Sequence, residues 1–309
     1  MGILSMFGLG SFANAQEKDN ADKGQLDKLD SLLTTYKSQP VYYAKYGNRG
    51  CLFELRINDM LIDELTRPRN IGETSTTINP AILKSGKQTF TVRLYPFPGE
   101  TSITNENPFR LEIGYIDFAR EANEDEIRPW NAVFTLPAIE VPDEGLPYIE
   151  LTGEFEATVP YQIKGCSDCI DLRTLPDIEE RVVKEYQYVR ELIALKKTKE
   201  LREYFTGRDY EAGVALYESL NDIDNYWNKH VRHRLEMFTK EELQPIEDYR
   251  LVFSGNGRSV SLRSKKKKGK PSALLFIKQE IGNPNFESYY IELHLGIKIG
   301  TNKLTAIIM

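Results

Sequence analysis

The sequence has no excess of positive charge, no long apolar segment after its first residues and no recognised catalytic motif. Its formal net charge is -6, so counterion release gives it no general attraction to nucleic acid. No apolar run approaches the length needed to cross a bilayer. There is neither a G-x-S-x-G sequence nor a glycine-rich phosphate loop. We therefore expect no cofactor, no nucleic-acid partner and no membrane span.

Cysteine is scarce, with Cys51, Cys166 and Cys169 the only three in the chain. Cys166 and Cys169 have no second ligand pair with which to form a zinc site. They also lie too far before the next expected helix for a redox C-x-x-C motif, because residues 170–175 intervene. In an exported protein this pattern predicts a structural disulfide, between Cys166 and Cys169 or from one of them to Cys51. One thiol must then stay unpaired.

Histidine is equally scarce, with three residues. His230 and His233 lie three apart on an expected helix, a spacing that can place two imidazoles on one metal ion. The pair lacks the glutamate and the four-residue step of a zincin helix, so we predict no metal site. His294 is expected on the polar face of a strand. These three side chains are the only general bases that we can suggest for catalysis.

The composition is that of a folded chain: 40% of the residues are hydrophobic, 11% aromatic and 28% charged. A length of 309 residues predicts about two cores. Residues 1–15 are apolar from Ile3 to Ala13 and end in Ala13-Asn14-Ala15, the pattern of a signal-peptide cleavage site, although a basic start is missing. We expect a signal peptide over 1–15, a polar lead-in over 16–40 with an amphipathic stretch at 26–36, and a soluble secreted or periplasmic protein.

Residues 41–165 show apolar residues at every second position, which predicts several strands. In the clearest, Cys51, Phe53, Leu55 and Ile57 share one face. Short strands of this kind fit two antiparallel sheets packed face to face, as in immunoglobulin-like or jelly-roll sandwiches. Turns are expected at residues 85–87 and 98–99. The segment from Ile78 to Tyr95 resembles many exported β-sandwich modules, which implies a fold class and no function.

Residues 166–309 change spacing twice. Apolar steps of three and four predict an αα-hairpin, with a helix that Thr174 caps, an interruption at Gly207 and a second helix over about 210–239. Period two then returns: Gly255-Asn256-Gly257 predicts a β-hairpin, and residues 272–281, 291–299 and 304–308 predict further strands. We expect the helices to pack on this antiparallel sheet, which makes the chain an α+β protein.

Aromatic residues are frequent, with 17 Tyr, 14 Phe and 2 Trp. Exposed aromatic side chains are typical of sugar-binding and protein-binding surfaces. Tyr42, Tyr43 and Tyr46, expected before the first strand, and Trp130, expected in a loop, are least explained by strand alternation. We predict that any binding platform uses these four.

Two charged runs are interpreted as solvated loops: residues 265–270, which are rich in lysine, and the acidic residues 121–126. The sequence then favours a non-catalytic binding or interaction protein of the cell envelope, with a protein or glycan partner; a toxin-blocking immunity role is one form of this. The alternative is a hydrolase with a histidine and carboxylates at the junction of the two parts. Oligomeric state cannot be deduced from the sequence.

Overall fold

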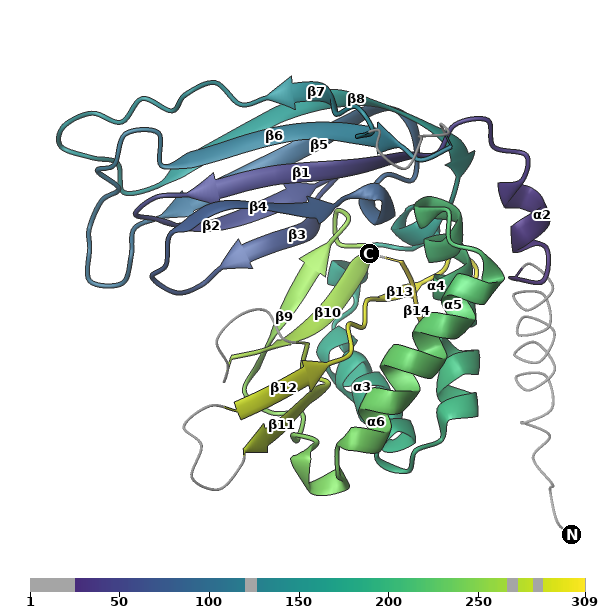
Figure 1. Ribbon diagram of the computed structural model, residues 1–309. Coiled ribbons are helices and arrows are strands. Elements are labelled where there is room, and N and C mark those ends of the chain that lie inside the picture. Colours follow the sequence, from purple (N-terminus) through teal and green to yellow (C-terminus); the bar gives the residue numbers. More distant parts are fainter. Residues whose placement is uncertain (1–25, 120–126, 266–271, 280–285, 309) are drawn as a thin grey trace, which may run out of the picture.

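The computed structural model describes residues 26–119, 127–265, 272–279 and 286–308. Residues 1–15, predicted as a signal peptide, lie outside this part, as do the acidic run 121–126 and most of the lysine-rich run. The chain is a mixed α+β protein, in which a β-sandwich is followed by helices and a second antiparallel sheet (Figure 1). This confirms the predicted fold class.

The sandwich consists of two four-stranded antiparallel sheets. The first, in the order β4-β1-β6-β7, contains β1 (Pro40–Asn48), β4 (Ile71–Thr77), β6 (Phe109–Asp117) and β7 (Asn131–Thr135). The second, in the order β3-β2-β5-β8, contains β2 (Leu52–Ile57), β3 (Met60–Leu65), β5 (Lys84–Tyr95) and β8 (Ile149–Gln162). Alternate residues of β2 and β1, such as Phe53 and Ala44, are buried between the sheets because each strand presents one apolar face.

The turn predicted at residues 85–87 is wrong, because these residues lie inside β5. The pairing of β5 with β8 shifts between Lys84 and Gly86, which marks a bulge. Gly86 has a φ of 116°, a backbone conformation that glycine adopts readily. A glycine between polar residues is therefore typical of a bulge as well as of a turn.

The C-terminal part begins with a 3-10 turn, η2 (Gly165–Asp168), and continues into helices. These are α3 (Ile178–Ala194), α4 (Thr198–Leu216), α5 (Leu220–Tyr226), the π-helical turn η4 (Trp227–Arg232) and α6 (His233–Met237). A four-stranded antiparallel sheet in the order β14-β13-β10-β9 follows, with β9 (Tyr249–Ser254), β10 (Ser259–Ser264), β13 (Leu295–Ile297) and β14 (Leu304–Ala306). A separate hairpin joins β11 (Leu275–Gln279) and β12 (Phe286–Tyr290). The β9–β10 hairpin at Gly255-Asn256-Gly257 is confirmed.

The helix boundaries differ from the predicted pair. Gly207 does not interrupt a helix, since α4 runs through it. The helices break twice instead: between α3 and α4 at residues 195–197, and after Leu216, where Ser219 and Asp222 form a reciprocal capping box that starts α5. Thr174 does not cap α3, because its hydroxyl donates to the carbonyl oxygen of Asp171 at 2.7 Å. The predicted second helix is therefore α5, η4 and α6 together.

The π-helical turn explains the spacing of the buried stripe. Ile223, Trp227, Val231 and Leu235 are buried at steps of four residues. On an ideal α-helix, such a step drifts around the axis by about 40° each time. The turns of the π-helical segment η4 contain more residues than α-helical turns, which compensates for this drift. All four side chains therefore stay on one side of the helix.

The strand predicted over 291–299 is shorter than expected. Only Leu295–Ile297 forms a strand, and residues 291–294 connect it to β12. His294 is buried rather than on an exposed polar face, while Ile299 is 65% exposed. Residues 293 to 297 are all buried, so both sides of the segment are covered by other parts of the chain. In such a segment, apolar and polar residues need not alternate, and the sequence pattern does not show which side chains are exposed.

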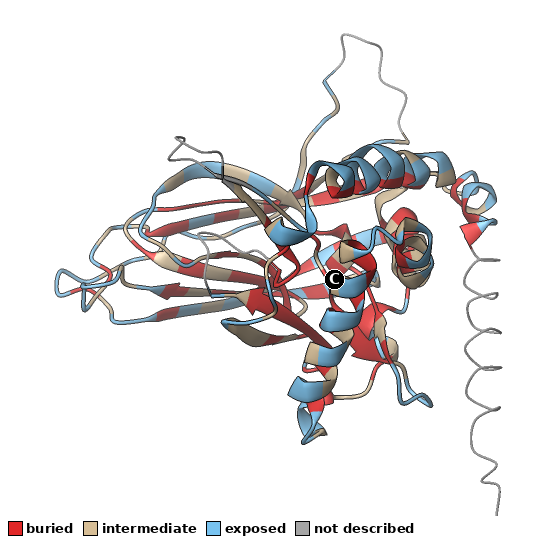
Figure 2. Ribbon diagram, turned by 90° about the horizontal axis from the view of Figure 1, so that it is seen from below, coloured by how far each residue is buried: buried red, intermediate tan, exposed pale blue. Residues whose placement is uncertain are grey.

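The two parts share one contiguous cluster of buried hydrophobic side chains. Buried residues line the strands of the sandwich and the inner sides of the helices (Figure 2). The stretch at 26–36 is amphipathic as predicted: α2 (Leu29–Leu33) buries Leu29 and Leu33, and Asp30 accepts a hydrogen bond from the backbone N–H of Leu220 at 2.7 Å. In the described residues, no helix is long and apolar enough to span a membrane. The boundary at 165 between two domains stays a prediction.

Asn79 connects the sandwich to the helices. Its side chain is fully buried, and its Oδ1 accepts from the backbone N–H of Tyr42 at 2.6 Å. Its Nδ2 donates to the carbonyl oxygens of Pro40 at 3.0 Å and of Ala215, near the end of α4, at 2.9 Å. One amide therefore satisfies backbone groups of β1 and α4 together.

Replacing Asn79 with Ala should lower the free energy of unfolding by about 3 kcal/mol, because it leaves these buried backbone groups without partners. Urea unfolding monitored by circular dichroism measures this. The matched control is Asn228→Ala, which removes an exposed amide from η4 and should change stability by less than about 0.5 kcal/mol. Equal effects of the two substitutions would contradict the role given to Asn79.

Candidate binding site

An aromatic pocket of about 400 Å³ lies between α4, the α5–η4 helix and the end of β12. Its size is within the usual range for small-molecule sites. Aliphatic side chains of α4 and α5 form part of its wall. The aromatic residues that line it are Phe205, Tyr226, Trp227, Tyr289 and Tyr290.

The polar centre of the pocket is Asp209 of α4, which is buried. One carboxylate oxygen accepts hydrogen bonds from the guanidinium of Arg208, at 3.0 Å from Nε and 2.6 Å from the second nitrogen. The other accepts from the indole N–H of Trp227. The Arg208 guanidinium also lies 3.8 Å from the centre of the Phe205 ring. These contacts fix Arg208 and Trp227 before any ligand binds.

Exposed tyrosines form the rim. Tyr226 is 51% exposed and Tyr290 is 41% exposed. The Tyr226 ring packs near that of His230, with centroids 5.7 Å apart. Tyr289 packs on Phe276 at 6.2 Å, so it joins the rim to the interior. The pocket thus offers ring faces at its mouth and an ion pair within.

Carboxyl groups outnumber cations among the lining residues: Asp209, Glu218 and Glu292 stand against Arg208. Glu292 lies 3.5 Å from Arg263, outside the pocket. Partial loss of hydration, with Asp222 and Asp209 nearby, raises the pKa of Glu218, whose side chain remains exposed. Burial raises the pKa of Tyr289 to about 12. The site is therefore aromatic with a negative balance of charge.

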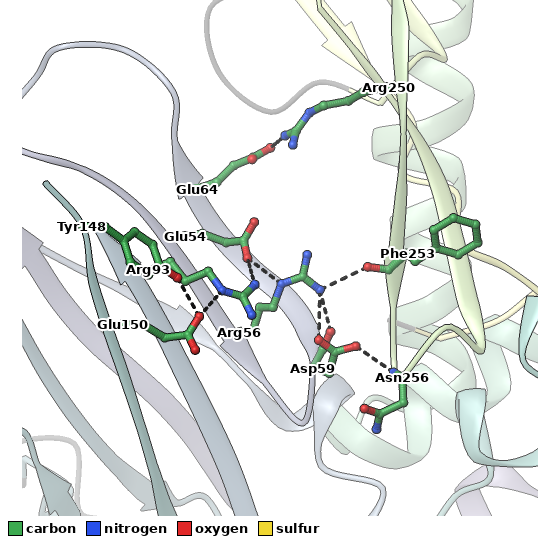
Figure 3. Close-up of polar contacts among 10 residues, drawn as sticks. All are labelled: Glu54, Arg56, Asp59, Glu64, Arg93, Tyr148, Glu150, Arg250, Phe253 and Asn256. Atoms are coloured by element: carbon green, nitrogen blue, oxygen red, sulfur yellow. Dashed lines mark hydrogen bonds and ion pairs between the residues drawn. The ribbon is translucent and has the colours of Figure 1, made fainter. Parts of the chain in front are cut away.

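A second polar cluster, the junction network, lies where the outer face of β2 and β5 meets β9 (Figure 3). Its central residue is Arg56, which is buried. The Arg56 guanidinium donates to Glu54 at 2.7 Å and to the carbonyl oxygen of Phe253 in β9 at 3.1 Å. It also bonds the backbone and side chain of Asp59, which accepts from the N–H of Asn256 at 2.7 Å.

The junction network extends along both neighbouring strands. Arg93 of β5 bridges Glu54 at 2.8 Å and Glu150 at 2.7 Å. Across the junction, Arg250 of β9 pairs with the buried Glu64 of β3. Each of these carboxylates has an arginine partner, so the cluster resembles a structural joint more than a set of acid and base groups.

The histidines do not lie in this junction. His230 and His233 are exposed on η4 and α6. His294 is buried in the C-terminal part, and burial together with Arg263 and Arg208 lowers its pKa to about 3. No group of three or more His, Cys, Asp or Glu residues that could hold a metal ion occurs in the residues that the structure describes. The junction therefore contains carboxylates but none of the three histidines that the hydrolase alternative uses.

The predicted aromatic platform is wrong for two of its members. Tyr42 and Tyr46 lie in β1 and point into the sandwich, 2% and 4% exposed, because the first strand begins at Pro40. Tyr43 and Trp130 lie on the outer side, partly buried, with ring centroids 6.4 Å apart. The ammonium of Lys45 lies 3.5 Å from the centre of the Trp130 ring. Lys45 of the same chain therefore already covers one face of the Trp130 ring.

The predicted disulfide is also absent: all three cysteines are described, and all are buried free thiols. Cys166 Sγ lies 3.9 Å from Met60 Sδ, whereas Cys169 Sγ faces the carbonyl oxygen of Gly165 at 3.9 Å. Cys51 Sγ faces the carbonyl oxygen of Pro108 at 3.4 Å. The three sulfurs have separate neighbours. Burial raises the pKa of Cys169 to about 12, which makes it an unreactive thiol.

Sequence reasoning missed the aromatic pocket, although it placed Trp227 on a buried helical stripe. A usable signal exists in two of the four aromatic doublets of the chain, Tyr226-Trp227 and Tyr289-Tyr290. Consecutive large rings cannot share the single buried side of a helix or strand, so one of each pair has to lie elsewhere.

Comparison of the chain with protein-family models, with curated proteins and with solved structures gave no match.

The raised pKa of Glu218 predicts how stability depends on pH. The folded state holds the proton more tightly than the unfolded state, so stability falls as pH rises from about 4.5 through the folded-state pKa. Glu218→Gln removes this penalty. The variant should be more stable than the wild type at pH 7, and the difference should disappear on acidification below about pH 4.

Thermal unfolding across this pH range tests the prediction. Glu180→Gln is the control with the opposite sign, because Lys184 lowers the pKa of Glu180 and its substitution removes a favourable pair. A Glu218→Gln effect that is the same at every pH would contradict the assignment.

Proposed function

We propose that this chain is a non-catalytic binding protein of the cell envelope that takes a small glycan in the aromatic pocket. The observation that carries the proposal is the combination of exposed ring faces at the rim with a fixed ion pair inside one pocket. Aromatic rings pack on the C–H faces of sugars. Carboxylates accept hydrogen bonds from sugar hydroxyls, and guanidinium groups donate hydrogen bonds to them. The enclosed size favours a short saccharide or a chain end over a folded protein surface.

Binding is favoured over hydrolysis by the state of the polar groups. Both oxygens of Asp209 are occupied by Arg208 and Trp227. No histidine is among the lining residues. Glycoside hydrolysis needs two carboxyl groups free to flank the bond. The remaining pair, Glu218 and Glu292, includes one whose carboxylate already lies next to Arg263.

A glycan array that covers neutral, amino and uronic sugars should identify a ligand for the full chain. Tyr226→Ala and Tyr290→Ala should each weaken its binding about tenfold, because each removes an exposed ring from the rim. Trp227 fluorescence in a Trp130→Phe background reports occupancy, since these are the only two tryptophans. The oligosaccharide should be recovered intact.

The matched control is Tyr95→Ala, which removes a tyrosine of similar exposure, 40%, that is not part of the pocket. It should leave affinity unchanged. An array without binding, or full affinity in both rim variants, would refute the proposal. Cleaved sugar would replace the binding role with an enzymatic one.

The envelope location rests on the sequence of residues 1–15 alone. Expressed in a Gram-negative host, the chain should be recovered from the periplasm with Gln16 as its first residue, as measured by mass spectrometry. Ala13→Leu with Ala15→Leu should block the cleavage, because signal peptidase needs small residues there. An uncleaved wild-type chain in the cytoplasm would contradict export and leave the glycan proposal standing.

A further inference from the structure

A second pocket, the junction pocket, has a volume of about 330 Å³ and lies beside the Asp59 end of the junction network. Its walls come from the start of β5, the β9–β10 loop and η2. Its charged lining residues are Lys84, Lys87 and Arg258, and no carboxylate of the described residues lines it. The protein as a whole has a net charge of -6, so the lining of this pocket has the opposite sign of charge.

Two of the three cations lack an ion-pair partner. The side chains of Lys84 and Arg258 form no hydrogen bond or ion pair with any residue that the structure describes. Lys87 pairs with Glu154 at 2.8 Å. Arg258 lies near Asp171, whose pKa Arg173 chiefly and Arg258 more weakly lower to about 2. Asp171 itself is held by Arg173 at 2.7 Å, and it forms no ion pair with Arg258 among the described residues.

Several neutral polar side chains of the pocket are already used. The Asn58 amide donates to Gln88 at 2.7 Å and to the carbonyl oxygen of Ala81 at 2.8 Å. Gln88 donates to the carbonyl oxygen of Gly86 at 2.8 Å. Ser167 donates to the carbonyl oxygen of Lys164 at 2.5 Å. The donors left for a ligand are therefore mainly the cations.

The loop that carries Arg258 is held in place. The carbonyl oxygen of Asp59 accepts from the N–H of Gly255 at 3.2 Å, and its carboxylate accepts from Asn256 (Figure 3). Gly255 has a φ of 58°, and a Cβ there would lie 2.5 Å from the Cys166 sulfur. The loop thus packs tightly on η2, and its Arg258 lines the same pocket as Lys84 and Lys87 of β5. Such pre-organisation lowers the entropy cost of binding.

We propose that the junction pocket binds a phosphate oxyanion, either free or as the end group of a small phosphorylated molecule. Lys84 and Arg258 line the same pocket without an ion-pair partner among the described residues, and an anion bound there would offset their mutual repulsion. The guanidinium fork of Arg258 fits two phosphate oxygens, and Lys84 supplies a point charge from the other wall. Because Lys84 belongs to the sandwich and Arg258 to the C-terminal sheet, the anion also clamps the two parts together.

Calorimetric titration of the full chain with inorganic phosphate and with glycerol phosphate tests this, together with thermal unfolding in the same solutions. Both anions should raise the melting temperature with concentration, above the effect of sodium chloride at equal ionic strength. Arg258→Gln and Lys84→Gln should each weaken binding at least about tenfold. Lys37→Gln, at an exposed lysine that does not line the pocket, should bind like the wild type.

The relative affinity of the two probes identifies the source of the anion. Tighter binding of glycerol phosphate supports a phosphorylated molecule, and tighter binding of inorganic phosphate supports the free ion. No heat of binding for either probe, stabilisation equal to that of sodium chloride, or equal loss in Lys37→Gln would overturn the proposal. Two separate pocket variants keep the test decisive if one of them folds poorly.

Discussion

The arrangement of the whole molecule depends on the burial of one cation, Arg56, on the outer face of the sandwich. A buried guanidinium is costly unless its donors are satisfied, and here they reach Glu54, the Asp59 loop and the Phe253 carbonyl oxygen of β9. Two of these partners belong to the sandwich and one to the C-terminal sheet. The hydrogen bond to Phe253 therefore ties β9 to the outer face of the sandwich. The Arg250 and Glu64 pair repeats the same constraint farther along β9.

The aromatic pocket depends on a second set of contacts, which hold α4 in place. Asn79 fixes the end of α4 to β1, and the N–H groups of Lys164 and Gly165 both bond the Glu211 carboxylate at 3.1 Å. The turn that contains Glu211 also carries Arg208 and Asp209. The polar centre of the pocket is thus built on a helix that Asn79 ties to β1 at its end and that Glu211 ties to the start of η2. A site supported in this way keeps its geometry without a ligand, which suits recognition of a small molecule.

Alternation predicted most of the sandwich because each of its strands buries one face, as in β2. It failed at the Gly86 bulge, where an irregularity inside β5 was interpreted as a turn between two strands. It also failed around His294, where both sides of the segment are covered. The helical stripe was found, but Gly207 was given too much weight: packing of α4 outweighs the modest cost of one glycine. The pocket could not be predicted, since its residues come from helices and a strand that are distant in sequence. Only the aromatic doublets indicated it.

The two pockets differ in the sign of their charge, and the net charge of -6 does not decide what either binds. At physiological ionic strength, charges farther apart than about 8 Å are largely screened, so a ligand responds to the lining residues. The aromatic pocket has more carboxyl groups than cations, whereas Lys84 and Arg258 line the other. Glu211 connects them, because it holds η2 at the junction pocket from the turn of α4 that forms the floor of the aromatic one. A substitution in that turn would therefore disturb both pockets. Only substitutions of side chains at the rims can change the binding of one ligand without changing the binding of the other.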